Sequence, residues 1–201
     1  MAQPNAHDSH VPFVQSRTMK VFLDFEASSL ADRSHPIEVA WVFQNGRQES
    51  HLITPAPNWT DWDDEAEDIH HITREMLAAD GEPHDEVARR MVEALSGHDL
   101  FASAPSWDGK WLSTLLRSAG IPRHELRLKD TDEALRETAL EILSAVFSGP
   151  RLETEVNNLV ARAAVDEGGP PAHRALPDAV AEQEKWVRTR DAARALVIAS
   201  G

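Results

Sequence analysis

The sequence predicts an α/β domain in which a mixed β-sheet is covered by helices on both faces. Three apolar runs near the beginning have strand-like composition and are separated by short polar connections. Farther along the chain, stretches with helical spacing of apolar residues alternate with short apolar runs. Tight turns join antiparallel strands, whereas strand and helix alternation produces parallel neighbours, so both kinds of pairing are expected in one sheet.

The first three strands are expected to form the antiparallel side of this sheet. The first covers residues 21–26 and the second covers 37–43, where apolar residues dominate. Asn45 and Gly46 follow the second strand and predict a tight hairpin, because both residue types tolerate a positive φ. The third strand is therefore expected over residues 48–53.

The rest of the chain predicts helices with two further strands between them. Short apolar runs predict a fourth strand over 100–104 and a fifth over 125–129. Thr131 or Asp132 is expected to cap a helix that continues to Phe147. Helices are expected over about 65–70, 73–79, 85–95, 107–119, 131–147, 152–165 and 176–197.

Length and composition favour one domain over residues 19–201, preceded by a disordered N-terminal segment over 1–18. The 201 residues suffice for one hydrophobic core, and the first 18 show no periodicity. The chain has no cysteine, which excludes disulfides, thiolate metal sites and a cysteine nucleophile. It has no apolar run of transmembrane length and no basic and apolar leader, so a cytoplasmic protein without a membrane partner is expected.

The charge balance restricts how the chain could bind nucleic acid. Acidic residues outnumber basic ones by 34 to 20, which gives a formal net charge of -14. Affinity for long nucleic acid comes largely from lysine and arginine, so a broad basic surface is not expected. A site that grips a few phosphates through metal ions remains compatible with this composition.

Two carboxylates, Asp24 and Glu26, interrupt the otherwise apolar first strand. Because side chains in a strand alternate between faces, these two lie side by side, and Leu23 and Phe25 face the other way. Adjacent carboxylates repel each other and lose solvation, and a divalent cation would offset both costs. The alternative is that the strand ends here and both groups are solvated, and this stretch alone does not decide between the two.

Three further polar residues lie at expected strand and helix ends. Asp108 follows the fourth strand near a helix start, and His173 and Asp178 flank the start of the last helix. Taken singly, each aspartate is most simply a partner of a helix dipole, and a lone surface histidine has no special role. However, open α/β sheets bind their ligands at the carboxyl ends of strands, which is where Asp108 is expected.

Taken together, these segments resemble the three motifs of the DEDDh subfamily of DnaQ-like exonucleases, which have an RNase H fold. Asp24-Phe25-Glu26 matches the Asp-x-Glu motif, and Asp108 matches the aspartate of the second motif. His173 and Asp178 match the third motif, His-x-x-x-x-Asp. The resemblance covers roughly residues 19–187 and implies a mixed five-stranded sheet of the RNase H type.

The resemblance also implies a site and a reaction. Two Mg²⁺ or Mn²⁺ ions would be held by four carboxylates, those of Asp24, Glu26, Asp108 and Asp178. Asp24 would bridge both ions, Glu26 and Asp178 would help hold the ion on the nucleophile side, and Asp108 would serve the other. His173 would be the general base that takes a proton from the attacking water. The implied activity is a 3′–5′ exonuclease that releases nucleoside 5′-monophosphates from single-stranded nucleic acid or short oligonucleotides.

The chain also departs from the family pattern. Ser103 and Ala104 stand where relatives often carry His-Asn, which puts substrate choice in doubt more than the metal site. Elsewhere Pro36-Ile37-Glu38-Val39 resembles the second-strand signature of the family, and Ile69 to Thr73 resembles a segment that often reads His-Gly-Ile. RNA or DNA 3′ ends are the expected partners, and the assembly state, monomer or homodimer, stays open.

Several other residues could contact a substrate but have simpler interpretations. Trp59, Trp62 and Trp111 could stack on bases, although Trp107 and Trp111, four residues apart, are better explained as core. Three cations near the motifs could meet phosphates, although a solvated surface position is the simpler reading for each, namely Arg33, Lys110 and Arg174.

Two rival functions remain open at this level. One is a non-catalytic RNase H-like module that binds a nucleic-acid end or a protein, which the loss of any one acid would have favoured. The other is a phosphodiesterase on the same scaffold that acts on nucleotides or very short oligonucleotides, a reading that fits the acidic net charge. No phosphate loop, zinc-protease motif or serine-hydrolase elbow occurs in the sequence.

Overall fold

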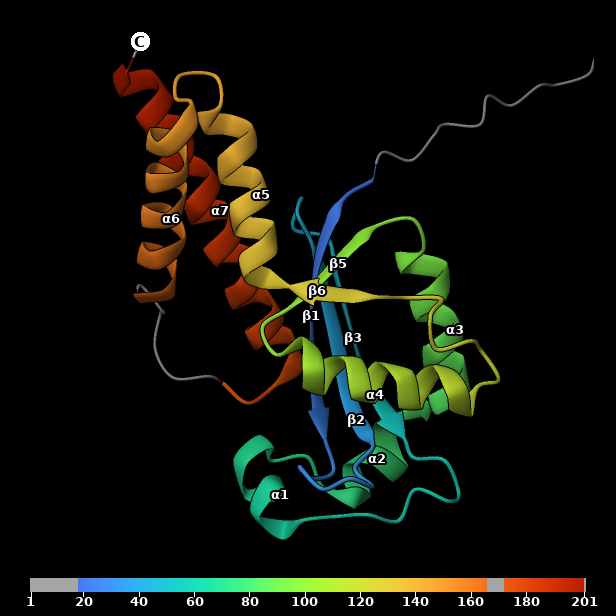
Figure 1. Ribbon diagram of the computed structural model, residues 1–201. Helices are drawn as coiled ribbons and strands as arrows, with labels where there is room; N and C mark the ends of the chain where they lie inside the picture. Colours follow the sequence, from blue (N-terminus) through green and yellow to red (C-terminus); the bar gives the residue numbers. More distant parts are fainter. Residues whose placement is uncertain (1–17, 166–171, 201) are drawn as a thin grey trace, which may run out of the picture.

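The computed structural model describes residues 18–165 and 172–200 (Figure 1). The segment 1–18, expected to be disordered, lies outside the described residues except for Thr18. No described helix combines the length and apolar composition needed to cross a bilayer. The elements are, in chain order, β1 (Lys20–Ala27), β2 (Pro36–Phe43), β3 (Gln48–Thr54), α1 (Asp64–His70), α2 (Arg74–Asp80), β4 (Glu82–Pro83), α3 (His84–Leu95), β5 (Asp99–Ala102), α4 (Pro105–Ser118), β6 (Leu128–Asp130), α5 (Thr131–Leu143), α6 (Gly149–Val165) and α7 (Ala175–Ser200).

The sheet is mixed, as the sequence predicts. Its strand order is β4-β3-β2-β1-β5-β6, in which β1, β2 and β3 are antiparallel and β5 and β6 run parallel to β1. The hairpin between β2 and β3 closes where the Phe43 N–H donates to the Arg47 carbonyl, and Gly46 adopts a φ of +87°. The prediction that Asn45-Gly46 turns the chain here is therefore confirmed.

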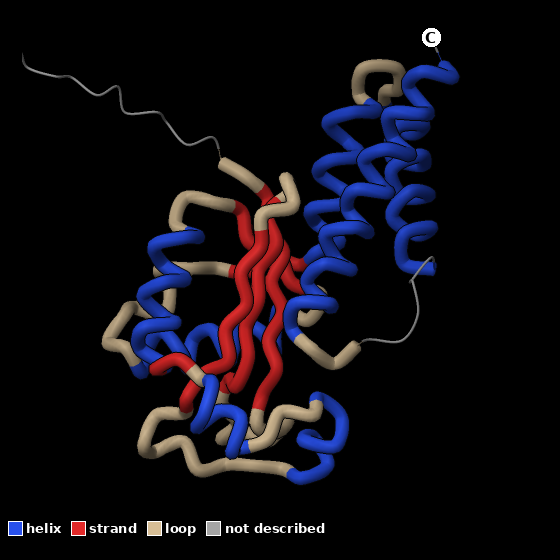
Figure 2. The backbone as a smooth tube through the Cα atoms, turned by 180° about the vertical axis from the view of Figure 1, so that it is seen from behind, coloured by secondary structure: helices blue, strands red, loops and turns tan. Residues whose placement is uncertain are grey.

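Helices cover both faces of the sheet, and the two faces of β1 meet different helices (Figures 1 and 2). Leu23 and Phe25 belong to a core that β1 and β2 form with α3 and α4. Phe22, on the other face, packs with Phe101 of β5 and Trp186 of α7. The alternation along β1 therefore turns Asp24 and Glu26 towards α7.

The helices α5, α6 and α7 continue beyond the sheet and pack on one another (Figure 2). Their shared core contains Leu143 of α5, Val156 and Leu159 of α6, and Ala193 of α7. This packing fixes the long helix α7 against both α5 and the sheet. The N-terminal turn of α7 is thereby held next to the end of β1 that carries the acids.

The structure corrects four details of the prediction. The sheet has six strands instead of five, because the two-residue strand β4 pairs with the end of β3 and is too short to give a pattern. The last strand is Leu128–Asp130 instead of 125–129, and Asp130, not Thr131 or Asp132, caps α5. That helix ends at Leu143, before the expected Phe147, and Phe147 packs into the core of the three helices after the chain has turned.

Candidate metal centre and active site

The centre of the site is the carboxyl end of β1. Asp24 lies opposite Ala40 of β2, and Glu26 lies opposite Glu38, just before the pairing shifts at Ala27. Both acids are partly buried on the face that meets α7. The shift after Glu26 ends the regular pairing of β1 with β2 next to the two acids.

Asp178 completes a three-carboxylate cluster from the first turn of α7. One oxygen from each of Asp24, Glu26 and Asp178 lies within 4.8 Å of the other two. The loop before α7 helps to position Asp178, since the Ala172 N–H donates to its Oδ1 at 2.9 Å. The structure thus brings two acids of the strand and one of the helix into a single group.

Asp108 reaches the same centre from the first turn of α4 and is only 2% exposed. Its Oδ2 has no hydrogen-bond partner among the described residues. Burial raises the pKa of Asp108 to about 7, although backbone groups at Ala104 and Phe25 oppose this. A buried carboxylate with an unpartnered oxygen is costly unless a cation or a proton joins it.

The acids destabilise one another's charged forms. Burial, then the charges of Asp108, Glu26 and Asp178, hold the pKa of Asp24 well above its ordinary value. Burial and the charge of Asp178 raise the pKa of Glu26 to about 8, although Arg174 opposes this. Without a cation these carboxyl groups cannot all be ionised near neutral pH.

These residues fit a divalent cation of the Mg²⁺ or Mn²⁺ type. The donors are carboxylate oxygens from three separate elements, which is the ligand type that hard cations prefer. Among them, the Oδ2 of Asp108 has no hydrogen-bond partner among the described residues, and the charge of Asp108 raises the pKa of Asp24, so this carboxylate is available to a cation near the other acids. Two bound cations would supply four positive charges and remove the repulsion described above.

A fifth carboxylate, Glu182, was not expected from the sequence. It lies one helical turn after Asp178 on α7, and its Oε2 is buried without a hydrogen-bond partner. Its charge raises the pKa of both Asp24 and Asp108, so it faces the same centre. The signal that could have revealed it is the i, i+4 spacing from Asp178, which places both side chains on one helix face.

The start of α7 is fixed by an ion pair between a buried glutamate of β2 and a partly exposed arginine. Glu38 is 3% exposed and accepts from Arg174 Nε at 3.0 Å, Arg174 Nη2 at 2.7 Å and the Ala175 N–H at 2.9 Å. Such bidentate pairing is strong and geometrically specific. From the sequence, Arg174 could meet a phosphate, although a solvated surface position was the simpler interpretation. Instead, its guanidinium binds both carboxylate oxygens of Glu38 and so aligns α7 with the sheet.

His173 lies between these two anchors, at the start of α7 where the sequence places it. Its side chain is exposed and its backbone is left-handed, with a φ of +53°. Its ring makes no hydrogen bond or ion pair with a described acid. Thus the structure groups three of the motif acids, with Asp108 near enough to raise the pKa of Asp24, but it does not bring the imidazole into contact with them.

The other predicted contact residues divide between core and surface. Trp111 is buried and donates from Nε1 to Ser34 Oγ at 3.0 Å, so its interpretation as core is confirmed. Trp107 is 39% exposed, and the same interpretation is wrong for it. Lys110 lies 5.1 Å from the Trp107 ring centre and donates to the Ala31 carbonyl at 2.6 Å, which holds the loop after β1.

Comparison with known proteins gives matches only among solved structures. No protein-family model matches the chain, and no curated protein sequence matches it. Zinc-bound Escherichia coli exonuclease I in complex with single-stranded DNA is 18% identical with a TM-score of 0.61, over 88% of this chain. Exonuclease I from Methylocaldum szegediense, described as moderately thermophilic, is 22% identical with a TM-score of 0.63, over 91%. A third match is E. coli exonuclease I with a dT13 oligonucleotide, at 16% identity, a TM-score of 0.61 and 88% coverage.

The likeness concerns part of each of these larger proteins. The chain spans 42%, 43% and 42% of the three exonuclease I chains, respectively. At these identities the agreement shows a common architecture, a mixed sheet with helices on both faces. The chain therefore has the RNase H-like fold that the motifs imply, shared with exonuclease I structures.

Proposed function

We propose that this chain is a metal-dependent 3′–5′ exonuclease of the DEDDh type. The observation that carries the proposal is the convergence of Asp24, Glu26 and Asp178 within 4.8 Å, with the buried Asp108 alongside. Pairing with helix dipoles would explain Asp108 and Asp178 singly, but it does not explain why acids from three elements gather in one place. The exonuclease I neighbours include complexes with single-stranded DNA and oligonucleotides, which supports a single-stranded substrate.

In this proposal the four motif acids hold two Mg²⁺ or Mn²⁺ ions. When bound, such ions make water more acidic and stabilise charge on the leaving oxygen of an in-line displacement. Asp24, which is at the centre of the acid cluster, is the residue best placed to serve both ions. Glu26 and Asp178 share the 4.8 Å group with Asp24, and Asp108 comes from the first turn of α4.

His173 is the proposed general base, and it must turn towards the acids to act. Its loop is tied on one side through Ala172 to Asp178 and on the other through Arg174 to Glu38. To fill this role, the exposed His173 side chain would rotate between these fixed neighbours until an imidazole nitrogen reaches the attacking water. Catalytic hydrogen bonds often tighten only when substrate is bound, so the exposed ring is compatible with this role.

The proposal is tested by digestion of 3′-labelled and 5′-labelled single-stranded RNA and DNA with Mg²⁺, Mn²⁺ or chelator. We expect stepwise, metal-dependent shortening from the 3′ end that stops in the Asp24→Asn variant. The products should be nucleoside 5′-monophosphates. Cleavage of dinucleotides alone would favour a small-substrate phosphodiesterase, and no cleavage despite bound metal would favour a binding module.

A further inference from the structure

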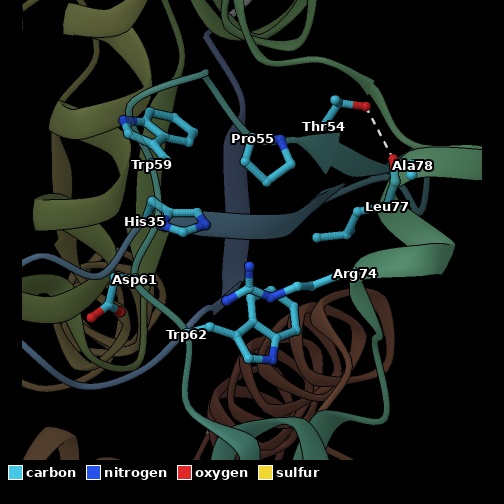
Figure 3. A pocket seen from close by; sticks show the side chains of 9 residues that line it. All are labelled: His35, Thr54, Pro55, Trp59, Asp61, Trp62, Arg74, Leu77 and Ala78. Carbon is cyan, nitrogen blue, oxygen red and sulfur yellow. Dashed lines mark hydrogen bonds between the residues drawn. The ribbon is translucent and has the colours of Figure 1, made fainter.

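A cavity of about 210 Å³ lies beside the loop that follows the acid strand (Figure 3). Its walls come from the β1–β2 loop, the end of β3, the loop before α1, and α2. The principal lining side chains are His35, Pro55, Trp59, Trp62, Arg74 and Leu77. Each water molecule in the liquid occupies about 30 Å³, so the cavity has room for about seven water molecules. This volume suits a single planar ring system better than a whole nucleotide.

The cavity contains a buried hydrogen-bond acceptor without a partner. His35 is 1% exposed, and its Nε2 has no hydrogen-bond partner among the described residues. Figure 3 shows the ring extending towards the space between Pro55, Leu77 and Arg74. A buried polar atom of this kind normally has a partner, so one is expected inside the cavity.

The hydrogen bonds around His35 determine which nitrogen carries the proton. Asp61 Oδ2 accepts from Ser28 Oγ at 3.0 Å, which uses the single hydroxyl proton of Ser28. Ser28 Oγ must then accept from His35 Nδ1, 3.2 Å away, so Nδ1 carries the hydrogen and Nε2 is a bare acceptor. Burial lowers the pKa of His35 to about 4, so the ring is neutral near pH 7.

Arg74 supplies the complementary donors. Its guanidinium lies 4.8 Å from the ring centre of Trp62, and Figure 3 shows it at the lower side of the cavity. It makes no hydrogen bond or ion pair with another described residue. Its donors are thus free to meet a ligand, and the guanidinium, on an exposed side chain, lies over the Trp62 ring.

These features favour a nucleobase over a phosphate. Every nucleobase has a flat ring with N–H donors and O or N acceptors on its edge, which match His35 Nε2 and Arg74. A phosphate would meet the carboxylate of Asp61 and only one cation, already stacked on an indole. The cavity is also tied to the acid strand, since Ser28, two residues after Glu26, contacts His35.

We propose that this cavity binds one base of the substrate strand, with a base N–H donated to His35 Nε2 and a base acceptor bound by Arg74. The choice of a nucleobase as occupant rests on the proposed function. The cavity lies apart from the acid cluster and uses none of its residues. It would hold the strand through a base while the acids act on a phosphate.

The test uses adenosine and cytidine, which are uncharged and need no metal. Each is titrated into the full chain in chelator, with ribose as the control that lacks a base. We expect one histidine Nε2 resonance, in ¹⁵N spectra of the imidazoles, to move as that nitrogen accepts a hydrogen bond. Arg74→Met should weaken nucleoside binding by about 5- to 30-fold, the loss expected for one or two hydrogen bonds. Arg89→Met is the matched control, since Arg89 is an exposed arginine of α3 paired with Asp85.

The outcomes separate this inference from the proposed function. If neither nucleoside moves a histidine resonance, or Arg74→Met binds them as the wild type does, the cavity is not a base site, whatever the chain cleaves. If nucleosides bind with the expected dependence on Arg74 and Asp24→Asn binds them equally, the base site stands. In that case failure of the wild type to cleave any substrate would count against the exonuclease alone.

Discussion

The two faces of strand β1 have opposite characters, one apolar and one acidic. Leu23 and Phe25 are at most 4% exposed and belong to the main core with α3 and α4. Asp24 and Glu26 alternate with these residues along the strand and face α7 and other carboxylates. One strand therefore contributes stability through one face and, on the other, carries charges that oppose folding without a cation. The acids are held in place because the apolar face outweighs their repulsion.

The largest change is expected from Asp24→Asn, which alters the acid face and leaves the apolar face intact. If Asp24 serves both ions, exonuclease activity should fall by about 10³-fold or more, since metal ions supply several kcal/mol of transition-state stabilisation. The folded chain should become more stable in chelator near pH 8, because a repelled carboxylate has been removed. Digestion rates and thermal unfolding measure the two effects, and Asp64→Asn, an exposed acid of α1, is the control. Unchanged activity would remove Asp24 from the site.

His173→Ala tests whether the acids act alone. We expect turnover to fall by about 10²–10⁴-fold, the usual contribution of a general base, while metal affinity stays near that of the wild type. Single-turnover digestion and Mn²⁺ titration report the two quantities separately. Loss of metal affinity along with activity would make His173 a ligand instead of a base.

Leu23→Ala changes the opposite face of the same strand. Removing a fully buried leucine should lower the free energy of unfolding by about 2–5 kcal/mol without altering metal affinity. Chemical denaturation with and without Mn²⁺ measures this, and Leu30→Ala, at a leucine 69% exposed, should cost far less. Equal losses for the two variants would mean that β1 is not packed as described.

The pH dependence of stability tests the acidic face of β1 in the wild-type chain, because only that face carries groups that titrate. The pKa of Glu26 is raised from 4.5 to about 8 and that of Asp108 from 3.8 to about 7, so the folded chain binds more protons than the unfolded chain between these values. Stability from these groups is present below about pH 4 and is lost as the pH rises to about 8. In chelator the melting temperature should fall from pH 5 to pH 8, and Glu26→Gln should flatten that fall. A melting temperature that rises over this range, in wild type and variant alike, would contradict the shifts.

The smallest effect concerns Glu182, the acid that α7 adds to the cluster. Its replacement by glutamine should weaken Mn²⁺ binding by about 10-fold, the scale seen for groups that support metal ligands. Glu184→Gln is the matched control on the same helix, because Glu184 is exposed and lies 3.9 Å from Arg188. Isothermal titration with Mn²⁺ measures both variants. Equal affinities would show that Glu182 faces the centre without contributing to it.

Local patterns predicted much of the fold and the central acids. Period-two alternation placed Asp24 and Glu26 on one face, and Asn45-Gly46 predicted the hairpin, because both depend on neighbouring residues only. The resemblance to the DEDDh motifs implied that Asp178 would join them. The four motif acids were therefore named from the sequence, whereas Glu182, which faces the same centre, was not.

Features that depend on contacts between distant residues were not predicted. Arg174 pairs with Glu38, 136 residues away, and His35 closes a cavity with Arg74 across several loops. Strand β4 was missed because its two residues pair only where β3 happens to end beside them. Trp107 was assigned to the core from its spacing, yet the first turn of α4 leaves it exposed.

The central claim, that these acids form a metal centre, is tested most directly by counting bound Mn²⁺ with electron paramagnetic resonance at equilibrium. We predict two ions for each wild-type chain and a loss of at least about 100-fold in affinity in Asp24→Asn. A wild-type chain that binds no Mn²⁺, or an Asp24→Asn chain that binds it equally well, would contradict the account.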